Sequence, residues 1–193
     1  MIAPLDRRPL VVALAGPNGA GKSTFYHAHL APSGLRFVNA DQLADQLRIG
    51  PYHAAELAGQ IRMNLVARRE SFVFETVFSD PVGDKLAFLK AAERNDCTVV
   101  LIFIGIAGPA VSQERVAMRV AKGGHDVPDE KLISRYGRTM ENLRRALACL
   151  ANVYVYDNSN LAAPYRRVVK VEDGELAVLA AVPEWLAPLL PVA

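Results

Sequence analysis

The eight residues from Thr98 to Gly105 read TVVLIFIG, and this run constrains the fold more than any other stretch of the chain. It is rich in β-branched residues and apolar throughout. Such a run is typical of a strand covered on both faces, as in parallel sheets that lie between two layers of helices. We therefore expect these residues to form a central strand of an α/β sheet.

Other apolar runs of strand length alternate with longer helical patterns, which predicts parallel strands joined by crossover helices. The expected strands cover residues 10–16, 35–40, 71–76, 98–105 and 153–158, and the expected helices cover residues 22–30, 42 onward, 54–69, 81–95, 112–121 and 128 onward. The tail differs, because two apolar runs flank Asp173 and Gly174, a hairpin signal. A short helix with Trp185 packed on the body should follow. The 193 residues show no linker or repeat, so we expect one three-layer domain over residues 1–193.

Composition excludes some classes of protein. No apolar run reaches the ~18 residues that span a bilayer, and a net charge of +2 does not favour a nucleic-acid partner. The apolar N-terminal run continues into a glycine-rich loop, so we interpret it as the first strand and not as a cleaved secretion signal. Cys97 and Cys149 lack metal-ligand spacing and are expected to be buried reduced thiols. These features favour a cytoplasmic protein.

Residues 16–23 read GPNGAGKS and fit the phosphate-loop pattern G-x-x-x-x-G-K-[ST], between a predicted strand and a predicted helix. The glycines let the backbone fold around an anion, and the helix N-terminus adds its positive dipole end. Lys22 should reach the β- and γ-phosphates, and the Ser23 hydroxyl should complete the shell of a Mg²⁺ ion. The predicted ATP-binding residues of this loop are Gly16, Pro17, Asn18, Gly19, Ala20, Gly21, Lys22, Ser23 and Thr24. The fold class is thus a P-loop NTPase or kinase fold.

Polar residues at strand ends are the next candidates, because ligands of open α/β sheets bind beyond the carboxyl ends of the strands. Asp41 follows the second predicted strand. It has two interpretations: a cap of the following helix, or a base that accepts the proton of an attacking hydroxyl. We favour the base.

Glu75 and Thr76 end the third predicted strand, and Asp157 and Asn158 end the last parallel one. An acid at the end of an apolar strand needs a partner or a ligand. Glu75 could orient an acceptor, with Thr76 beside it, or contact Mg²⁺ through water. Asp157 and Asn158 are either turn residues or contacts to the nucleotide base, and we include Asn158 among the ATP-binding residues.

An arginine-rich region, residues 110–138, is predicted to form a helical lid. Its first helix carries Arg115 and Arg119, whose like charges four residues apart repel unless an anion lies between them. Arg119, Arg135 and Arg138 flank a glycine pair that breaks the helix. Arginine can fork onto phosphoryl oxygens and neutralise charge that grows during transfer. A solvated helix face is the alternative.

The segments LAGPNGAGKSTF, FVNADQLA, FVFETVFS and RVAKGGHDVPDEKLISRYGR, followed by VYDNS, together resemble the zeta toxin family of P-loop kinases. The resemblance covers about residues 11–158, and R-V-x-x-G-G-H-x-V-P is its most discriminating part. Characterised members use ATP and Mg²⁺ to phosphorylate a sugar hydroxyl of UDP-N-acetylglucosamine. The resemblance implies that Asp41 is the base, that Glu75 helps to hold the sugar, and that Arg119 with Arg135 or Arg138 grips the phosphates. It also implies an antitoxin as a candidate partner.

Three functions fit these residues. The leading hypothesis is an ATP-dependent kinase that acts on a hydroxyl of a small acceptor, with UDP-N-acetylglucosamine as the candidate. The second is a polynucleotide or nucleoside kinase. The third is a P-loop NTPase or nucleotide-binding module that transfers phosphate to no acceptor.

Overall fold

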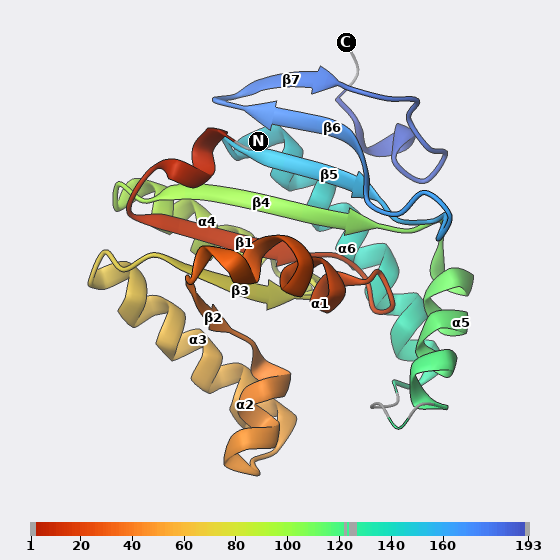
Figure 1. The fold of residues 1–193 in the computed structure, drawn as a ribbon, viewed down its shortest axis with the longest axis horizontal. Helices are drawn as coiled ribbons and strands as arrows, with labels where there is room; N and C mark the ends of the chain where they lie inside the picture. Colours follow the sequence, from red (N-terminus) through yellow and green to blue (C-terminus); the bar gives the residue numbers. More distant parts are fainter. Residues whose placement is uncertain (1–2, 122, 124–126, 192–193) are drawn as a thin grey trace.

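The computed structural model describes residues 3–121, 123 and 127–191, and within these residues seven strands form one sheet (Figure 1). The strands are β1 (Leu10–Ala15), β2 (Arg36–Val38), β3 (Phe72–Thr76), β4 (Thr98–Gly105), β5 (Val153–Asp157), β6 (Arg166–Glu172) and β7 (Glu175–Val178). Their order is β2-β3-β1-β4-β5-β6-β7. The first five are parallel, and β6 and β7 are antiparallel. The predicted mostly parallel sheet and the C-terminal hairpin are confirmed.

Helices cover both faces of the sheet, as the three-layer prediction requires. They are α1 (Lys22–Phe25), which continues as a π-helix (Tyr26–Leu30), then α2 (Ala40–Leu47), α3 (Pro51–Ala67), α4 (Asp84–Arg94), α5 (Pro109–Val120) and α6 (Asp129–Cys149). The first helix packs on one face of the sheet, and α3, α4 and α6 pack on the other. None of the helices in the described ranges combines the length and the apolar character needed to cross a membrane.

Strand β4 is central and buried along almost its whole length. Val99, Leu101 and Phe103 belong to the apolar core on the α6 side. The alternate side chains, such as Ile102 and Ile104, belong to the core on the α1 side. The prediction from the TVVLIFIG run is confirmed, because both faces of this strand are covered.

Three helices, α2, α3 and α5, begin two or three residues earlier than the sequence pattern predicted. Helix α2 begins at Ala40, because the Asn39 side chain accepts hydrogen bonds from the first backbone amides of the helix and caps it. Helix α3 begins at Pro51, because proline suits the first turn of a helix, where its missing N–H costs nothing. Strand β2 is correspondingly short.

The C-terminal segment packs on the end of β4 and β5 through Trp185. Its ring lies directly on Gly105, where an added Cβ would come within 2.1 Å of a ring carbon. The ring nitrogen donates a hydrogen bond to Asp157 Oδ1 at 3.1 Å. A short 3₁₀-helix, Ala187–Leu189, follows. The predicted packing of Trp185 on the body is confirmed.

Replacing Gly105 by alanine is expected to lower the free energy of unfolding by about 1–3 kcal/mol, because the new methyl group overpacks the Trp185 contact. Urea unfolding followed by tryptophan fluorescence measures the change. The matched control is Gly137→Ala in α6, where an added Cβ meets no atom within 4 Å and stability should rise slightly. Equal stability of Gly105→Ala and the unchanged protein would contradict the packing argument.

Candidate active site

The phosphate loop lies at the carboxyl end of β1, on the side to which the arrowheads of the parallel strands point in Figure 1. Gly16 and Gly21 have φ angles of 145° and 90°, a region that side chains other than glycine rarely adopt. A Cβ at Gly16 would also lie 2.1 Å from the carbonyl oxygen of Ile104. The predicted strand–loop–helix arrangement is confirmed, and its glycines are required by conformation and by space.

Lys22 is buried at the start of α1, with 7% of its surface exposed. Its ammonium donates hydrogen bonds to the carbonyls of Gly16 and Pro17, at 3.0 and 3.1 Å, so it lies across the loop. Burial lowers the pKa of Lys22, while the charges of Glu75 and Asp41 raise it and that of Arg119 lowers it. The charges of Glu75, Asp41 and Arg119 thus act on the lysine of the loop.

Glu75, on β3, contacts both the phosphate loop and Asn39, the residue that follows β2. Because β3 pairs with β1 in the register Leu14↔Glu75, the acid lies beside the start of the loop. Its Oε2 accepts hydrogen bonds from Ser23 Oγ at 3.1 Å and from Asn39 Nδ2 at 3.2 Å. Its Oε1 lies 3.9 Å from Lys22 Nζ. The structure therefore joins two predicted site residues, Ser23 and Glu75, in a direct contact.

Asp41 lies in the first turn of α2, but it does not cap that helix. The amides of Asp41 and Gln42 both donate to Asn39 Oδ1, at 2.8 and 3.1 Å. The capping interpretation of Asp41 is therefore wrong. Asp41 is exposed and helps to line a pocket of about 160 Å³. The lining residues are Asn39, Ala40, Asp41, Glu75, Thr76 and Val77.

The arginines of the predicted lid lie on two helices, α5 and α6, that run side by side (Figure 1). Arg119 is exposed near the end of α5, and Arg135 is half-buried on α6. Arg138 donates from Nε to the carbonyl of Ser79, at 2.9 Å, which places it on the loop that follows β3. Residues 122 and 124–126, which include His125 of the discriminating motif, lie outside the described residues.

Asp157 and Asn158 are buried and hydrogen-bonded within the protein. Burial raises the pKa of Asp157, but hydrogen bonds from Ser159, Trp185 and Arg166 outweigh burial and hold the pKa below its ordinary value. Asn158 donates from Nδ2 to the carbonyl of Ala20 at 2.8 Å. The side chain of Asn158 therefore contacts the backbone of the phosphate loop.

Sequence reasoning missed the contacts that three residues of α5 and α6 make with backbone carbonyls. Arg115 donates to the carbonyls of Asn158 and Ser159, at 2.8 and 3.0 Å. Thr139 donates to the carbonyl of Val77 at 2.9 Å, and the amide of Asn142 donates to those of Phe78 and Asp80 at 2.9 and 3.0 Å. The available signal was that Thr139 and Asn142 are polar residues on the face of α6 that also carries the buried Met140 and Leu143. The two polar side chains hold the loop that extends from Thr76 in place.

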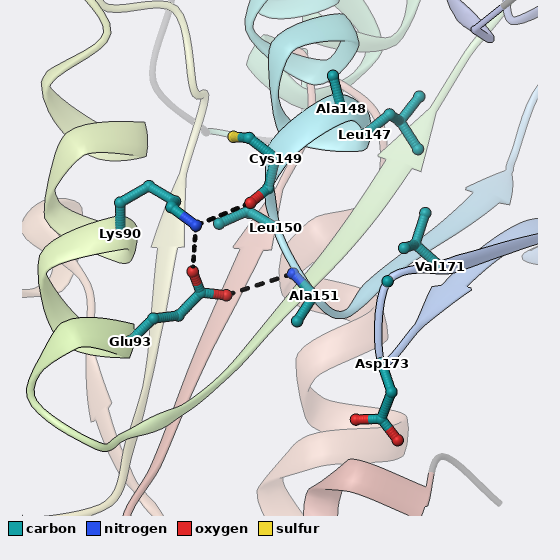
Figure 2. Close-up of a pocket in the computed structure, with 10 residues that line it drawn as sticks. Lys90, Glu93, Leu147, Ala148, Cys149, Leu150, Ala151, Val171 and Asp173 are labelled. Atoms are coloured by element: carbon teal, nitrogen blue, oxygen red, sulfur yellow. Dashed lines mark hydrogen bonds and ion pairs between the residues drawn. The ribbon is translucent and has the colours of Figure 1, made fainter.

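A second hollow, of about 330 Å³, lies at the opposite end of the sheet between α4, the end of α6 and the β6–β7 turn (Figure 2). Its Lys90 ammonium donates to Glu93 Oε2 and to the carbonyl of Cys149, both at 2.8 Å. Cys149 is exposed, so the prediction of a buried thiol is wrong there, whereas Cys97 is buried. Its charged groups are all paired, Lys90 with Glu93 and backbone and Asp173 with Arg7, so we do not assign the active site to this hollow.

Solved structures share this fold at low sequence identity. One chain of the AvrRxo1-ORF1:AvrRxo1-ORF2 complex with ATP has a TM-score of 0.69 and 18% identity, over 92% of this chain and 62% of that chain. The PezAT toxin-antitoxin system of Streptococcus pneumoniae has a TM-score of 0.62 and 16% identity, over 85% and 72%. The Pnkp1/Rnl/Hen1 RNA repair complex has a TM-score of 0.52 and 17% identity, over 70% and 46%. This chain thus spans less than two thirds of the AvrRxo1 chain that it matches.

The resemblance to the zeta toxins is confirmed at the level of the fold, which this chain shares with AvrRxo1 and with a chain of the PezAT toxin-antitoxin system. No curated protein matches the sequence. Residues 11–143 match the family model described as AAA domain. That segment is more than two thirds of the 193 residues and contains the phosphate loop, Asp41 and Glu75. The protein therefore belongs to the AAA domain family, as a P-loop member with a kinase-like fold.

Proposed function

We propose that this protein is an ATP-dependent kinase that transfers the γ-phosphoryl group to a hydroxyl of a small acceptor. The observation that carries the proposal is the pocket beside the phosphate loop, which is lined by Asp41 and by the Glu75 that contacts Ser23 and Lys22. Asp41, which its helix does not need as a cap, lines this pocket, and we propose that the acceptor binds there. A P-loop NTPase that transfers phosphate to no acceptor would have no acceptor hydroxyl for Asp41 to deprotonate.

In the proposed reaction, the Asp41 carboxylate accepts the proton of the acceptor hydroxyl as its oxygen attacks the γ-phosphorus. The bond from that phosphorus to the β,γ-bridging oxygen breaks, and ADP leaves with the electron pair. Asp41 then releases its proton to water. Lys22 and the lid arginines Arg119, Arg135 and Arg138 neutralise charge on the phosphoryl oxygens.

Two residues fit a Mg²⁺ ion that accompanies the triphosphate. Ser23 and Glu75 place hydroxyl and carboxylate oxygens, the ligands that Mg²⁺ prefers, within 3.1 Å of each other. We propose that Ser23 ligates the ion directly and that Glu75 contacts it through water. An ion bound there would offset the negative charge of the phosphates. The described residues contain no cluster of three acid, histidine or cysteine side chains that could hold a metal ion. This agrees with the usual Mg²⁺ site of few protein ligands plus phosphates.

For the acceptor we propose a UDP-amino sugar such as UDP-N-acetylglucosamine, with Glu75 and Thr76 on the acceptor side of the pocket. Support comes from the motifs shared with the zeta toxins and from the fold shared with AvrRxo1 and PezAT. Both neighbours were solved in systems of two components, so we include an antitoxin-like protein as a proposed partner. We also propose a cytoplasmic location, where ATP and nucleotide sugars are available, and a single kinase domain over residues 1–193.

The test is incubation of the protein with γ-labelled ATP, Mg²⁺ and either UDP-N-acetylglucosamine or a cell metabolite extract. Label on a sugar or another small hydroxylated molecule supports the kinase, and mass spectrometry then identifies the acceptor. Label found only as inorganic phosphate would favour the NTPase alternative. Label on the 5′ ends of added oligonucleotides would favour the polynucleotide kinase.

Replacing Glu75 by glutamine is expected to lower activity by about 10–100-fold and to raise the Mg²⁺ concentration needed for half-maximal rate, because outer-shell ligands tune metal sites by this amount. A Mg²⁺ titration at saturating ATP measures both effects. Glu93→Gln, in the hollow at the other end of the sheet, is the matched control and should change neither. A raised acceptor KM with an unchanged Mg²⁺ requirement would show that Glu75 acts on the acceptor alone and would remove its proposed contact with the ion.

A further inference from the structure

The phosphate loop is held from outside by side chains that bind its carbonyl oxygens. Four consecutive carbonyls each accept one hydrogen bond from a residue distant in sequence. The pairs are Ser112 Oγ to Asn18 (2.6 Å), Arg115 NH1 to Gly19 (3.5 Å), Asn158 Nδ2 to Ala20 (2.8 Å) and Tyr165 Oη to Gly21 (2.9 Å). We call these four donors the outer brace.

The outer brace determines where the amides of the loop point. In a planar trans peptide, the C=O of one residue and the N–H of the next point in opposite directions. Because the carbonyls of Ala20 and Gly21 turn toward the brace, the amides of Gly21 and Lys22 turn the other way, into the loop. The Ala20 amide, which follows the Gly19 carbonyl, donates to the carbonyl of Pro17 at 3.2 Å. Inward amides are what an anion-binding loop requires. The brace thus acts on the groups that would hold phosphate through the loop backbone, because its four bonds all end on loop carbonyls.

A loop of this composition needs such support. Glycine residues have wide conformational freedom, so bonds to neighbouring groups are needed to fix the peptide planes of the loop. The Gly21 carbonyl accepts the Phe25 amide at 2.9 Å, and the Tyr165 hydroxyl adds a second bond from outside the loop. Gly21 is the most tightly enclosed by the brace: a Cβ there would lie 2.8 Å from both Asn158 Nδ2 and Tyr165 Oη. Asn158 is 3% exposed, and Tyr165 takes a left-handed φ of 52°. The Tyr165 hydroxyl is also bonded to Thr24, so it joins the loop to the first helix.

We propose that Tyr165 is a positioning residue for the triphosphate, which acts by fixing the Gly21 peptide of the phosphate loop. The inference rests on the proposed function, because it concerns the same loop. It adds Tyr165, which lies between β5 and β6 and outside the quoted motifs, to the residues that determine phosphate affinity. Its hydroxyl makes the contact, and its ring packs on Phe25 with centroids 5.2 Å apart.

The chain offers a matched control. The Tyr156 ring also packs on Phe25, with centroids 5.2 Å apart, but its hydroxyl bonds Arg167 and not the loop. Tyr165→Phe and Tyr156→Phe each remove one hydroxyl from the same aromatic cluster. Binding of ATP is measured by titration calorimetry, and binding of inorganic triphosphate by competition. Thermal unfolding of both variants is measured in parallel, and Ser112→Ala tests a second donor of the brace.

Tyr165→Phe is expected to weaken binding of ATP and of inorganic triphosphate alike, by about fivefold, which is the effect of one lost hydrogen bond. Tyr156→Phe should bind both as the unchanged protein does, and the two melting temperatures should be similar. Equal affinities for the two variants would overturn the inference and leave the kinase proposal intact. Weaker ATP binding with unchanged triphosphate binding would also overturn it, because Tyr165 would then contact the nucleoside. An unchanged protein that binds neither compound would defeat both proposals.

Discussion

Asp41→Asn is expected to lower the rate of acceptor phosphorylation by about 10²–10⁴-fold, the usual contribution of a general base. The amide keeps the size of the side chain but cannot take the proton of the attacking hydroxyl. Asn39 caps α2, so the helix should form unchanged. Transfer of label from γ-labelled ATP to the acceptor measures the rate, and calorimetry measures ATP binding, which should survive.

The control for this variant is Asp45→Asn, one turn further along the same helix. It makes the same chemical change away from the pocket and should leave transfer within about twofold, as expected for an exposed surface substitution. An Asp41→Asn protein that phosphorylates the acceptor at the original rate would remove the case for Asp41 as the base. Transfer would then need another acceptor of the proton.

Lys22→Met is expected to lower phosphotransfer by about 10²–10³-fold, comparable to the loss of one preorganised donor at developing negative charge. Methionine preserves most of the buried stem and removes only the charge. Burial lowers the pKa of Lys22, so the folded protein already disfavours its charged form, and removing the charge relieves a desolvation cost. We therefore expect a folded protein with a melting temperature close to the original value and much weaker ATP binding.

Circular dichroism separates loss of function from loss of structure in this variant. Lys90→Met, which removes an ammonium from the hollow at the opposite end of the sheet, is the control and should transfer phosphate normally. Retained ATP binding and transfer in Lys22→Met would show that the loop lysine does not contact the phosphates. Unfolding of Lys22→Met would instead assign its ammonium a structural role through the carbonyls of Gly16 and Pro17.

Local patterns predicted much of the fold. The run from Thr98 to Gly105, the phosphate loop and the hairpin around Gly174 each lie within a few residues of continuous chain, and each formed where it was expected. The errors also have local causes. The Asn39 side chain took the cap that one interpretation gave to Asp41, and the exposed thiol of Cys149 lies at the last residue of α6, beside the hollow.

The sequence by itself therefore determined the layered α/β architecture and the anion-binding loop, because periodicity and glycine spacing act over short stretches of chain. Only the tertiary structure decided which side chains meet at that loop. Ser23 and Glu75 are 52 residues apart, and Gly21 and Tyr165 are 144 apart. Such contacts depend on strand order and on the packing of helices, and no short pattern encodes them. The chemistry of the site thus arises where distant segments converge at the carboxyl ends of the strands.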